Sequence, residues 1–444
     1  MLPYAIAVDN FVWGPPLLIL LVGTGIYLSI RLRLLQILKL PLAFRLIFAE
    51  DQGHGDISSY AALATALAAT VGTGNIVGVA TAIKSGGPGA LIWMWVAAFF
   101  GMATKYAEGV LAIKYRTKDA KGEISGGPMY YIVNGMGTKW RPLAILFAIS
   151  GILVALFGIG TFAQVNSITS AINHSFGLSS QITSILIAMV VACIIFGGIQ
   201  SISKVAEKIV PFMAIIYILA TLAIILVNSK MLLPTFMLIF KSAFTPTAAL
   251  GGFSGALVKD AIQKGIARGV FSNESGLGSA PIAAAAARTN EPVEQGLISM
   301  TGTFIDTIII CSLTGFAILI TGQWTSHLEG APLTQAAFAS VFGHVGIHAL
   351  TFSLVLFAFT TILGWSYYGE RCFEFLFGTK GITLFRLFFV FMVGLGGFLK
   401  LELIWIIADI VNGLMALPNL IALLALSPII ISETQRYFNK KQVI

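Results

Sequence analysis

The chain has 444 residues, of which 57% are hydrophobic and only 10% are charged, and its mean hydropathy is +0.90. A soluble domain carries roughly 25% charged residues, so this composition excludes a soluble globular protein and predicts an all-α polytopic membrane protein. At about 20 residues per span there is room for about a dozen helices. The net charge of +8 lies mostly in short loops, which indicates membrane topology and argues against nucleic-acid binding.

Ten apolar runs are long enough to cross a bilayer. They are Trp13–Ile30, Ile57–Ile83, Ala90–Ile113, Leu143–Phe162, Ile182–Phe196, Val210–Val227, Ile298–Ile320, Ile347–Tyr368, Leu384–Phe398 and Leu403–Ile431. The segment Leu232–Arg288 is less clear, because Lys259, Asp260, Lys264 and Arg268 interrupt its second part.

Basic residues settle how often that segment crosses. They gather after alternate spans, in the groups Arg31 to Arg45, Lys114 to Arg141, Lys204 with Lys208, Arg288, Arg371 with Lys380, and Arg436 to Lys441. Cytoplasmic loops carry the excess of Lys and Arg. We therefore expect the N-terminus outside, the C-terminus inside, one crossing within Leu232–Arg288, and eleven transmembrane helices in total.

Two glycine-interrupted stretches lie about 200 residues apart, TVGTGNIVGVAT at Thr70–Thr81 and VFSNESGLGSAP at Val270–Pro281. With the first span set aside, ten spans remain as five plus five, and an odd number per repeat turns the second repeat upside down. Each stretch then falls in the first span of its repeat, which is the arrangement of inverted-repeat transporters with broken helices. The expected divisions are an N-terminal helix and loop (1–56), a first repeat (57–230) and a second repeat (231–444).

The first interruption, Val71–Asn75, holds two glycines, each costing about 1 kcal/mol against alanine in a helix. Unwound backbone in a bilayer must face protein, water or ligand. Free N–H groups at the start of the outer half-helix favour a carboxylate, and free carbonyls at the end of the inner half favour a small cation. The alternative is a small-residue face for helix packing.

The second interruption has more side-chain polarity. Ser272 and Asn273 can bind an amine or a carboxylate, and Glu274 is an intramembrane carboxylate, which is a functional candidate by default. The alternative for Glu274 is an ion pair with Arg268 or Lys264. Those two basic residues otherwise line an outer vestibule.

The ninth span offers Thr360 and Thr361, whose adjacent hydroxyls could bind Na⁺, and Trp365, which shares a helix face with Thr361. The alternatives are hydroxyl bonds back to the preceding turn and an interfacial anchor for the indole. Gln164 and Asn166 are expected to end the fourth span, where either orients a small zwitterion or bonds to another helix.

Four further acidic or basic residues are less telling. Asp306 and Asp409 are lone mid-span acids that serve either as proton or cation sites or as structural hydrogen-bond partners. Lys105 and Glu108 are expected to form an ordinary pair at the cytoplasmic end of their span.

The three cysteines form neither a disulfide framework nor a metal site, and we expect all of them to be buried packing residues: Cys193, Cys311 and Cys372.

These motifs together resemble the alanine or glycine:cation symporters, a prokaryotic family of the amino acid–polyamine–cation group with the LeuT-type fold. The resemblance covers nearly the whole chain, and its most specific pieces are ATVGTGNIVGVATAI, GGPGALIWMWVAAFFGMATKYAE, SGGPMYYI, FGGIQSISKVAEKIVP and GVFSNESGLGSAPIAAAAA. One departure is Ile92, where the family more often has Phe; this affects packing and leaves the assignment intact.

The resemblance implies the site residues. Those expected to line the substrate pocket are Thr70, Gly72, Thr73, Gly74, Asn75, Gln164, Phe271, Ser272, Asn273, Thr361 and Trp365. The first break would hold the carboxylate through backbone N–H groups, and the indole would limit side-chain size. By fold-level analogy, the residues expected around Na⁺ are Ala68, Val71, Phe357, Thr360 and Thr361.

The sequence thus predicts a Na⁺-coupled symporter that imports alanine, glycine or a similar small neutral amino acid by alternating access. It needs no cofactor beyond the coupling ion, and it is expected to be monomeric in the prokaryotic inner membrane. The alternatives are proton coupling through Glu274 or Asp306 and, from another class, a channel. An enzyme is not expected, because the spans contain no catalytic Ser/His, Cys/His or HExxH arrangement. The choice between alanine and glycine, the stereochemistry and the Na⁺ stoichiometry stay open.

Overall fold

The computed structural model describes residues 2–51, 53–245, 258–398 and 401–442, and the structural statements below concern these. Nearly all of them are helical, as the composition predicts. Within these ranges the strands are one short antiparallel hairpin, β1 (Thr117–Lys118) with β2 (Ile124–Ser125).

The first half of the chain contains a peripheral group of helices, a broken pair and a series of long helices. The peripheral helices are α1 (Leu2–Val12), α2 (Pro15–Arg31), α3 (Leu35–Leu38) and α4 (Leu40–Ile47). The broken pair is α5 (Ser59–Thr70) and α6 (Val79–Gly86), with the π-helix η1 (Gly74–Gly78) between them. The rest are α7 (Ala90–Lys114), α8 (Pro128–Tyr131), η2 (Ile132–Met136), η3 (Thr138–Trp140), α9 (Arg141–Phe157), α10 (Phe162–Phe176), α11 (Ser180–Ile195) and α12 (Gly198–Val227).

The second half contains another broken pair. After η4 (Ser229–Met231) and α13 (Leu232–Phe244), the broken helix consists of α14 (Val258–Asn273) and α15 (Ala280–Ala285). The following elements are α16 (Pro292–Thr303), η6 (Phe304–Cys311), α17 (Ser312–Ile320), η7 (Gln323–Thr325), α18 (Gly330–Phe342), α19 (His344–Phe377), η8 (Thr379–Gly381), α20 (Ile382–Leu395), η9 (Gly396–Phe398), α21 (Leu401–Ala425) and α22 (Ser427–Gln442).

Seven helices of the described chain are long and apolar enough to cross a membrane, and the α5–α6 pair, bent by 52°, makes an eighth. Two expected spans are interrupted. The fourth run divides at residues 158–161, so Gln164 and Asn166 lie in the first turns of α10 and do not end a span. The seventh run contains the π-helix η6. Residues 246–257, inside the expected crossing at 232–288, lie outside the described residues.

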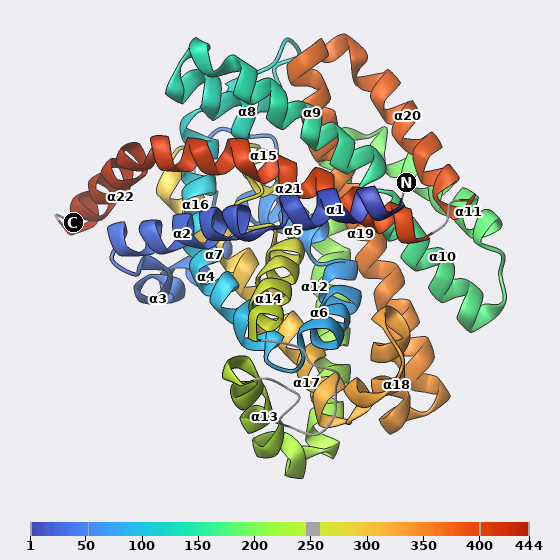
Figure 1. Cartoon of the computed structure of the whole chain (residues 1–444). Coiled ribbons are helices and arrows are strands. Elements are labelled where there is room, and N and C mark those ends of the chain that lie inside the picture. Colours follow the sequence, from blue (N-terminus) through green and yellow to red (C-terminus); the bar gives the residue numbers. More distant parts are fainter. Residues whose placement is uncertain (1, 52, 246–257, 399–400, 443–444) are drawn as a thin grey trace.

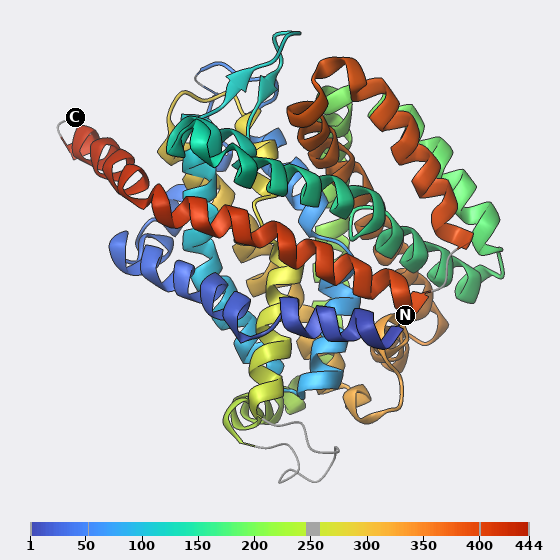
Figure 2. The ribbon, with the colours of Figure 1, turned by 45° about the horizontal axis from the view of Figure 1, so that its top comes forward.

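The centre of the molecule is α7, which packs against α14 and α16 (Figure 1). Figure 2 shows α1 running alongside α21, and α11 beside α20 on one flank. The flanking helices turn large apolar side chains outward, among them Ile185, Leu186, Leu387 and Phe391, as a bilayer requires. Cys193 lies on the outward face of α11 and is exposed, so its expected burial is wrong, while the other two cysteines are buried.

Helices α7 and α16 approach closely because each presents a glycine to the other. A Cβ added to Gly109 would lie 2.9 Å from the Gly296 Cα, and one added to Gly296 would lie 2.8 Å from the Tyr106 carbonyl oxygen. Small residues let membrane helices pack backbone to backbone.

Replacement of Gly296 by Ala should therefore destabilise the protein by about 1–3 kcal/mol, because the added methyl overpacks the crossing. Gly23→Ala in α2 is the matched control, since a Cβ at Gly23 has nothing within 4 Å. Thermal unfolding in detergent should show a lower Tm for Gly296→Ala alone; equal Tm values for the two variants would contradict this packing.

Candidate functional site

The first break is held by side-chain oxygens that accept from its backbone. The Gly72 N–H donates to the Asn75 Oδ1 at 2.9 Å, and the Thr73 N–H donates to the Gln164 Oε1 at 3.4 Å. Asn75 and Gln164 thus replace helical acceptors that unwinding removes, which meets the need of unwound backbone for partners inside a bilayer.

The second break is a non-helical segment between α14 and α15. Glu274, Gly276 and Gly278 all adopt the left-handed region, with φ of 56°, 87° and 82°. Glycine takes this conformation at little cost, whereas Glu274 is strained there. The glycines of the GLGS motif therefore allow the backbone to turn between the two half-helices.

Two charged residues of α7 hold this second break. The Glu108 Oε1 accepts from the N–H groups of Gly276 (3.1 Å) and Gly278 (3.2 Å), and the Lys105 Nζ donates to the Glu274 carbonyl oxygen at 3.2 Å. Both side chains are buried. The expectation that Lys105 and Glu108 form an ordinary pair with each other is wrong, because the carboxylate and the ammonium each bond to the unwound backbone.

Asp306 connects the two breaks. It accepts from the Asn75 Nδ2 of the first break at 2.7 Å, from the Ser272 Oγ of the second at 2.9 Å, and from the Thr307 Oγ1 at 2.7 Å. Thr307 in turn accepts from the Asn273 Nδ2 at 3.0 Å. Asp306 lies in the π-helix η6 and Asn75 in η1, and such local widening is frequent at functional sites.

The Glu274 carboxylate is fully buried and bonds to Ser279 and, at 3.0 Å, to the Trp365 Nε1. The alternative prediction of an ion pair between Glu274 and Arg268 is wrong, because the Arg268 guanidinium bonds instead to the Asp409 carboxylate at 2.8 Å. An interfacial role for Trp365 is also wrong, since the indole has no exposed surface.

The α19 threonines lie beside the first break. A Cβ at Gly72 would lie 2.4 Å from the Thr361 Oγ1, so only glycine fits there. Both Thr360 and Thr361 donate to the Phe357 carbonyl oxygen, each at 3.0 Å. The two hydroxyls therefore donate to the preceding turn of their own helix, which was the alternative prediction for them. Because each hydroxyl is the donor in this bond, its oxygen lone pairs are still available to a cation.

The structure brings many of the expected substrate residues to one place. Those joined by contacts around the breaks are Gly72, Thr73, Gly74, Asn75, Gln164, Ser272, Asn273 and Thr361. Phe271 instead lies under the Arg268 guanidinium, 5.2 Å from its ring centroid, and the Thr70 hydroxyl bonds back to the Ala66 carbonyl. Ala68 and Val71 are buried on the inner half of the first broken helix; their role as cation ligands stays a prediction.

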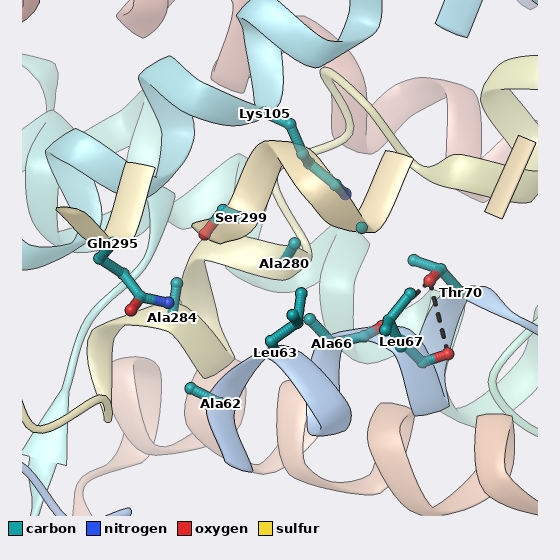
Figure 3. A pocket seen from close by; sticks show the side chains of 11 residues that line it. Ala62, Leu63, Ala66, Leu67, Thr70, Lys105, Ala280, Ala284, Gln295 and Ser299 are labelled. Atoms are coloured by element: carbon teal, nitrogen blue, oxygen red, sulfur yellow. Dashed lines mark hydrogen bonds between the residues drawn. The ribbon is translucent and has the colours of Figure 1, made fainter. Parts of the chain in front are cut away.

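Two pockets lie on opposite sides of the breaks. One has a volume of about 580 Å³ and is lined by α6, α10, α14 and α18, including Thr81, His174, Arg268 and Gln335. The other holds about 10 Å³, room for roughly one water, and is lined by α5, α7, α15 and α16 (Figure 3). Each pocket is thus walled by one half of both broken helices.

The far ends of α5 and α15 are joined beside the small pocket. The Asp56 N–H donates to the Ala286 carbonyl at 2.9 Å, and the Arg288 N–H donates to the Ile57 carbonyl at 2.9 Å. The Arg116 guanidinium donates to four carbonyl oxygens of the two segments, those of His54, Ala285, Ala287 and Thr289. This connection closes the small pocket at its mouth.

Sequence reasoning underrated Lys105, Glu108 and Asn419. Asn419 on α21 donates to the Glu108 Oε1 at 2.7 Å and to the Gly276 carbonyl at 2.9 Å. The available signal was two charges in the otherwise apolar segment GMATKYAEGV, because charges at membrane depth are expensive and need a partner.

Replacement of Glu108 by Ala should lower the stability by about 3 kcal/mol, because three buried donors lose their acceptor and each unsatisfied group costs roughly 1–3 kcal/mol before relaxation. Glu108→Gln keeps one acceptor oxygen and should cost less. Glu50→Ala, at an exposed position, is the control for loss of a carboxylate. Thermal unfolding in detergent gives the order; equal Tm values for the Ala and Gln variants would argue against the hydrogen bonds.

Known proteins resemble this chain over almost its full length. A relative from Haemophilus influenzae, named an uncharacterized transporter, is 58% identical over 98% of this chain and 96% of its own. The sodium/alanine symporter AgcS of Methanococcus maripaludis is 53% identical over 97% of this chain and 96% of its own. The probable sodium/glutamine symporter GlnT of Bacillus subtilis is 38% identical, with coverage of 98% and 90%.

Among solved structures, a manganese transporter of Eremococcus coleocola overlaps 87% of this chain and 82% of its own, at 12% identity and a TM-score of 0.49. That overlap assigns neither fold nor function. The model described as the sodium:alanine symporter family matches residues 4–443. The chain is therefore a polytopic membrane transporter, not an enzyme, and it belongs to the sodium:alanine symporter family.

Proposed function

We propose that this protein is a Na⁺-coupled symporter that imports alanine, glycine or a similar small neutral amino acid by alternating access. The observation that carries the proposal is the pair of pockets, one of about 580 Å³ and one of about 10 Å³, each walled by one half of both broken helices. A site between such halves can be exposed to either side in turn without a continuous pore. A channel would need a continuous pore and would not require two separate pockets between broken helices.

The substrate would lie between the two breaks, on the residues gathered there. The Thr73 hydroxyl is buried and has no hydrogen-bond partner among the described residues, so it can receive a ligand. Space is limited: a Cβ at Gly74 would lie 3.1 Å from the Ser272 Cα. This closeness favours a small amino acid, in agreement with the alanine named for the Methanococcus relative. Trp365 would bound the side chain from α19.

The coupling Na⁺ would bind where α19 meets the first break, since Na⁺ is a hard cation that takes oxygen ligands. Thr360, Thr361 and the Phe357 carbonyl present three oxygens from one helix, and the carbonyls of Ala68 and Val71 would complete the shell. One charge moving through 100 mV releases about 2.3 kcal/mol. That energy supports roughly 50-fold accumulation, because about 1.4 kcal/mol corresponds to tenfold.

For the architecture, we infer eleven spans with a LeuT-type five-plus-five inverted repeat. The eight candidate spans, the two shorter apolar helices α2 and α11, and the broken pair α14–α15 together number eleven. The repeats would occupy 57–230 and 231–444, with 1–56 as a peripheral segment. The loop charges support an N-terminus outside and a C-terminus in the cytoplasm of a prokaryotic cell, and one chain would suffice for transport.

Proton coupling is the second candidate, and one observation favours it. Glu274 and Asp306 are fully buried, and within the described ranges neither has a basic side chain within ion-pair distance. Buried carboxylates in membrane proteins mark proton or ion pathways.

Alanine uptake into proteoliposomes at fixed pH should require an inward Na⁺ gradient. Gly72→Ala should reduce that uptake about tenfold or more, because the added methyl displaces the Thr361 hydroxyl from the break. Gly394→Ala, whose Cβ would make an ordinary 3.7 Å contact with Ala188, is the matched control. Uptake that ignores Na⁺ but follows a pH gradient would overturn Na⁺ coupling in favour of proton coupling.

Thr361→Val should raise the Na⁺ concentration for half-maximal uptake about tenfold, since the isosteric side chain removes one cation ligand worth roughly 1.4 kcal/mol. The maximal rate at saturating Na⁺ should change little. Thr221→Val is the control, because the Thr221 hydroxyl also bonds back within its own helix, at 2.8 Å to the Tyr217 carbonyl, but lies on α12. An unchanged Na⁺ dependence in Thr361→Val would remove Thr361 from the ion site.

A further inference from the structure

A third pocket lies where the end of α2 and the start of α3 meet α22. Its volume of about 400 Å³ is within the range of ligand sites. Three basic side chains line it, those of Arg31, Arg33 and Lys39, and the described residues of its wall include no carboxylate and no part of a broken helix. Figure 1 shows α22 at one edge of the molecule, beside the N-terminal helices. This basic pocket is therefore separate from the transport site.

A strained turn places the three basic side chains around the basic pocket. Arg33 and Leu34 both adopt the left-handed region, with φ of 56° and 54°, although neither is glycine. The Leu34 N–H closes the turn by donating to the Ser29 carbonyl oxygen at 2.8 Å. Side chains other than glycine take this conformation at a cost, and such residues gather at ligand sites. Here the turn puts one cation before it, one within it and one after it on the same pocket.

The cations of the basic pocket have aromatic contacts and no carboxylate partner. The Lys39 Nζ lies 4.6 Å from the centroid of the Phe438 ring, and the Arg31 Cζ lies 5.8 Å from the centroid of the Tyr27 ring. Within the described ranges, the side chains of Lys39, Arg31 and Arg33 take part in no hydrogen bond or ion pair. Their N–H groups are therefore available to an anion, and the planar guanidinium groups match the oxygens of a phosphate.

The carboxylates that α22 brings near have other partners. Glu433, the single acidic residue of that helix, pairs with Lys114 of α7 at 2.7 Å and with Arg436 at 2.9 Å. Glu291, which precedes α16, pairs with Arg436 at 3.2 Å. These pairs hold α22 against α7 and α16, and they leave the positive charge of the basic pocket without a counterion in the described part of the chain.

The surroundings of the basic pocket favour a lipid over a free anion. Arg31 is the last residue of α2, a helix that we count among the spans, so the pocket lies at the level of the lipid headgroups. The loop charges support the cytoplasmic side, where anionic lipids attract Lys and Arg. At the pocket Leu38 is 68% exposed, and its neighbour Ile37 is 52% exposed. An acyl chain would cover these side chains, whereas a free phosphate would not.

We propose that the phosphodiester of an anionic phospholipid binds in the basic pocket. Its oxygens accept hydrogen bonds from Arg31, Arg33 and Lys39, and its acyl chains lie on Leu38 toward the bilayer. The bound lipid joins the turn between α2 and α3 to α22, which is itself paired to α7 and α16. It thereby stabilises the cytoplasmic end of the protein, whichever ion drives transport.

Phosphatidylglycerol tests the proposal, because it carries one anionic phosphodiester. Added to the purified protein in detergent, it should raise the Tm in a saturable manner, whereas phosphatidylcholine, whose headgroup is neutral overall, should raise the Tm much less. The triple variant Arg31→Gln, Arg33→Gln and Lys39→Gln should need about a hundredfold more phosphatidylglycerol for half of the rise. Each basic residue near an anionic lipid contributes roughly fivefold to the affinity.

A control variant removes the same charge from loops that are expected on the same side. Arg45→Gln, Lys139→Gln and Arg141→Gln change exposed side chains outside the basic pocket, and together they should leave the titration with phosphatidylglycerol unchanged. Inorganic phosphate, and glycerophosphoglycerol as the headgroup without acyl chains, should raise the Tm of the wild type little. If the first triple variant does not fold, Lys39→Gln alone should still shift the half-point about fivefold.

Equal titrations of the wild type and the pocket variant would overturn the lipid site, as would equal responses of the wild type to phosphatidylglycerol and phosphatidylcholine. A Tm rise of the same size with inorganic phosphate would indicate a soluble anion and would also overturn it. These measurements need neither Na⁺ nor an amino acid. Absence of alanine uptake would instead refute the proposed function, so the two failures can be told apart.

Discussion

The structure depends on one constraint, that backbone polar groups freed inside a bilayer must find partners within the protein. Both broken helices create such groups at membrane depth. At the first break, Asn75 and Gln164 supply neutral acceptors. At the second, the left-handed turn needs stronger partners, and α7 supplies a carboxylate for the N–H groups and an ammonium for a carbonyl.

This use of charge explains why α7 lies at the centre. Glu108 and Lys105 lie one turn apart on the same helix face. The negative carboxylate of Glu108 bonds to backbone N–H groups, which carry a partial positive charge, and the positive ammonium of Lys105 bonds to a carbonyl oxygen, which carries a partial negative charge. Charge-assisted hydrogen bonds are roughly twice as strong as neutral ones, which offsets part of the cost of burying both ions. The glycine contact of α7 with α16 brings the helix close enough for such short side-chain bonds.

The sequence predicted the helical architecture and both breaks, because glycines and polar residues within an apolar run disfavour a continuous membrane helix. It did not predict the partners. Lys105 and Glu108 appeared to be a local pair because they are three residues apart, whereas their partners are about 170 residues away in the segment between α14 and α15. Arg268 similarly bonds to Asp409 and not to its near neighbour Glu274. Spacing along one helix identifies faces, and only the packing of helices decides which faces meet.

The two sides of the site are held together by different contacts, and this difference bears on how the small pocket opens. On the side of the large pocket, the outer half-helices are tied to η6 through the side chain of Asp306. On the side of the small pocket, Asp56 and Arg288 bond to backbone across the mouth, and Arg116 holds both segments. A Cβ at Gly55 would lie 2.3 Å from the Ala287 carbonyl oxygen.

Opening the small pocket therefore requires these backbone bonds to break together, as in the separation of two strands. Along the rest of its length α5 faces α15 mainly through alanines, whose apolar contacts are non-directional and resist sliding little. Each broken hydrogen bond costs about 1 kcal/mol net, so the connection at the mouth can hold the closed state by a few kcal/mol. That range is comparable to the driving energy of one Na⁺ at a normal membrane potential, so binding of ion and substrate can decide which side is open.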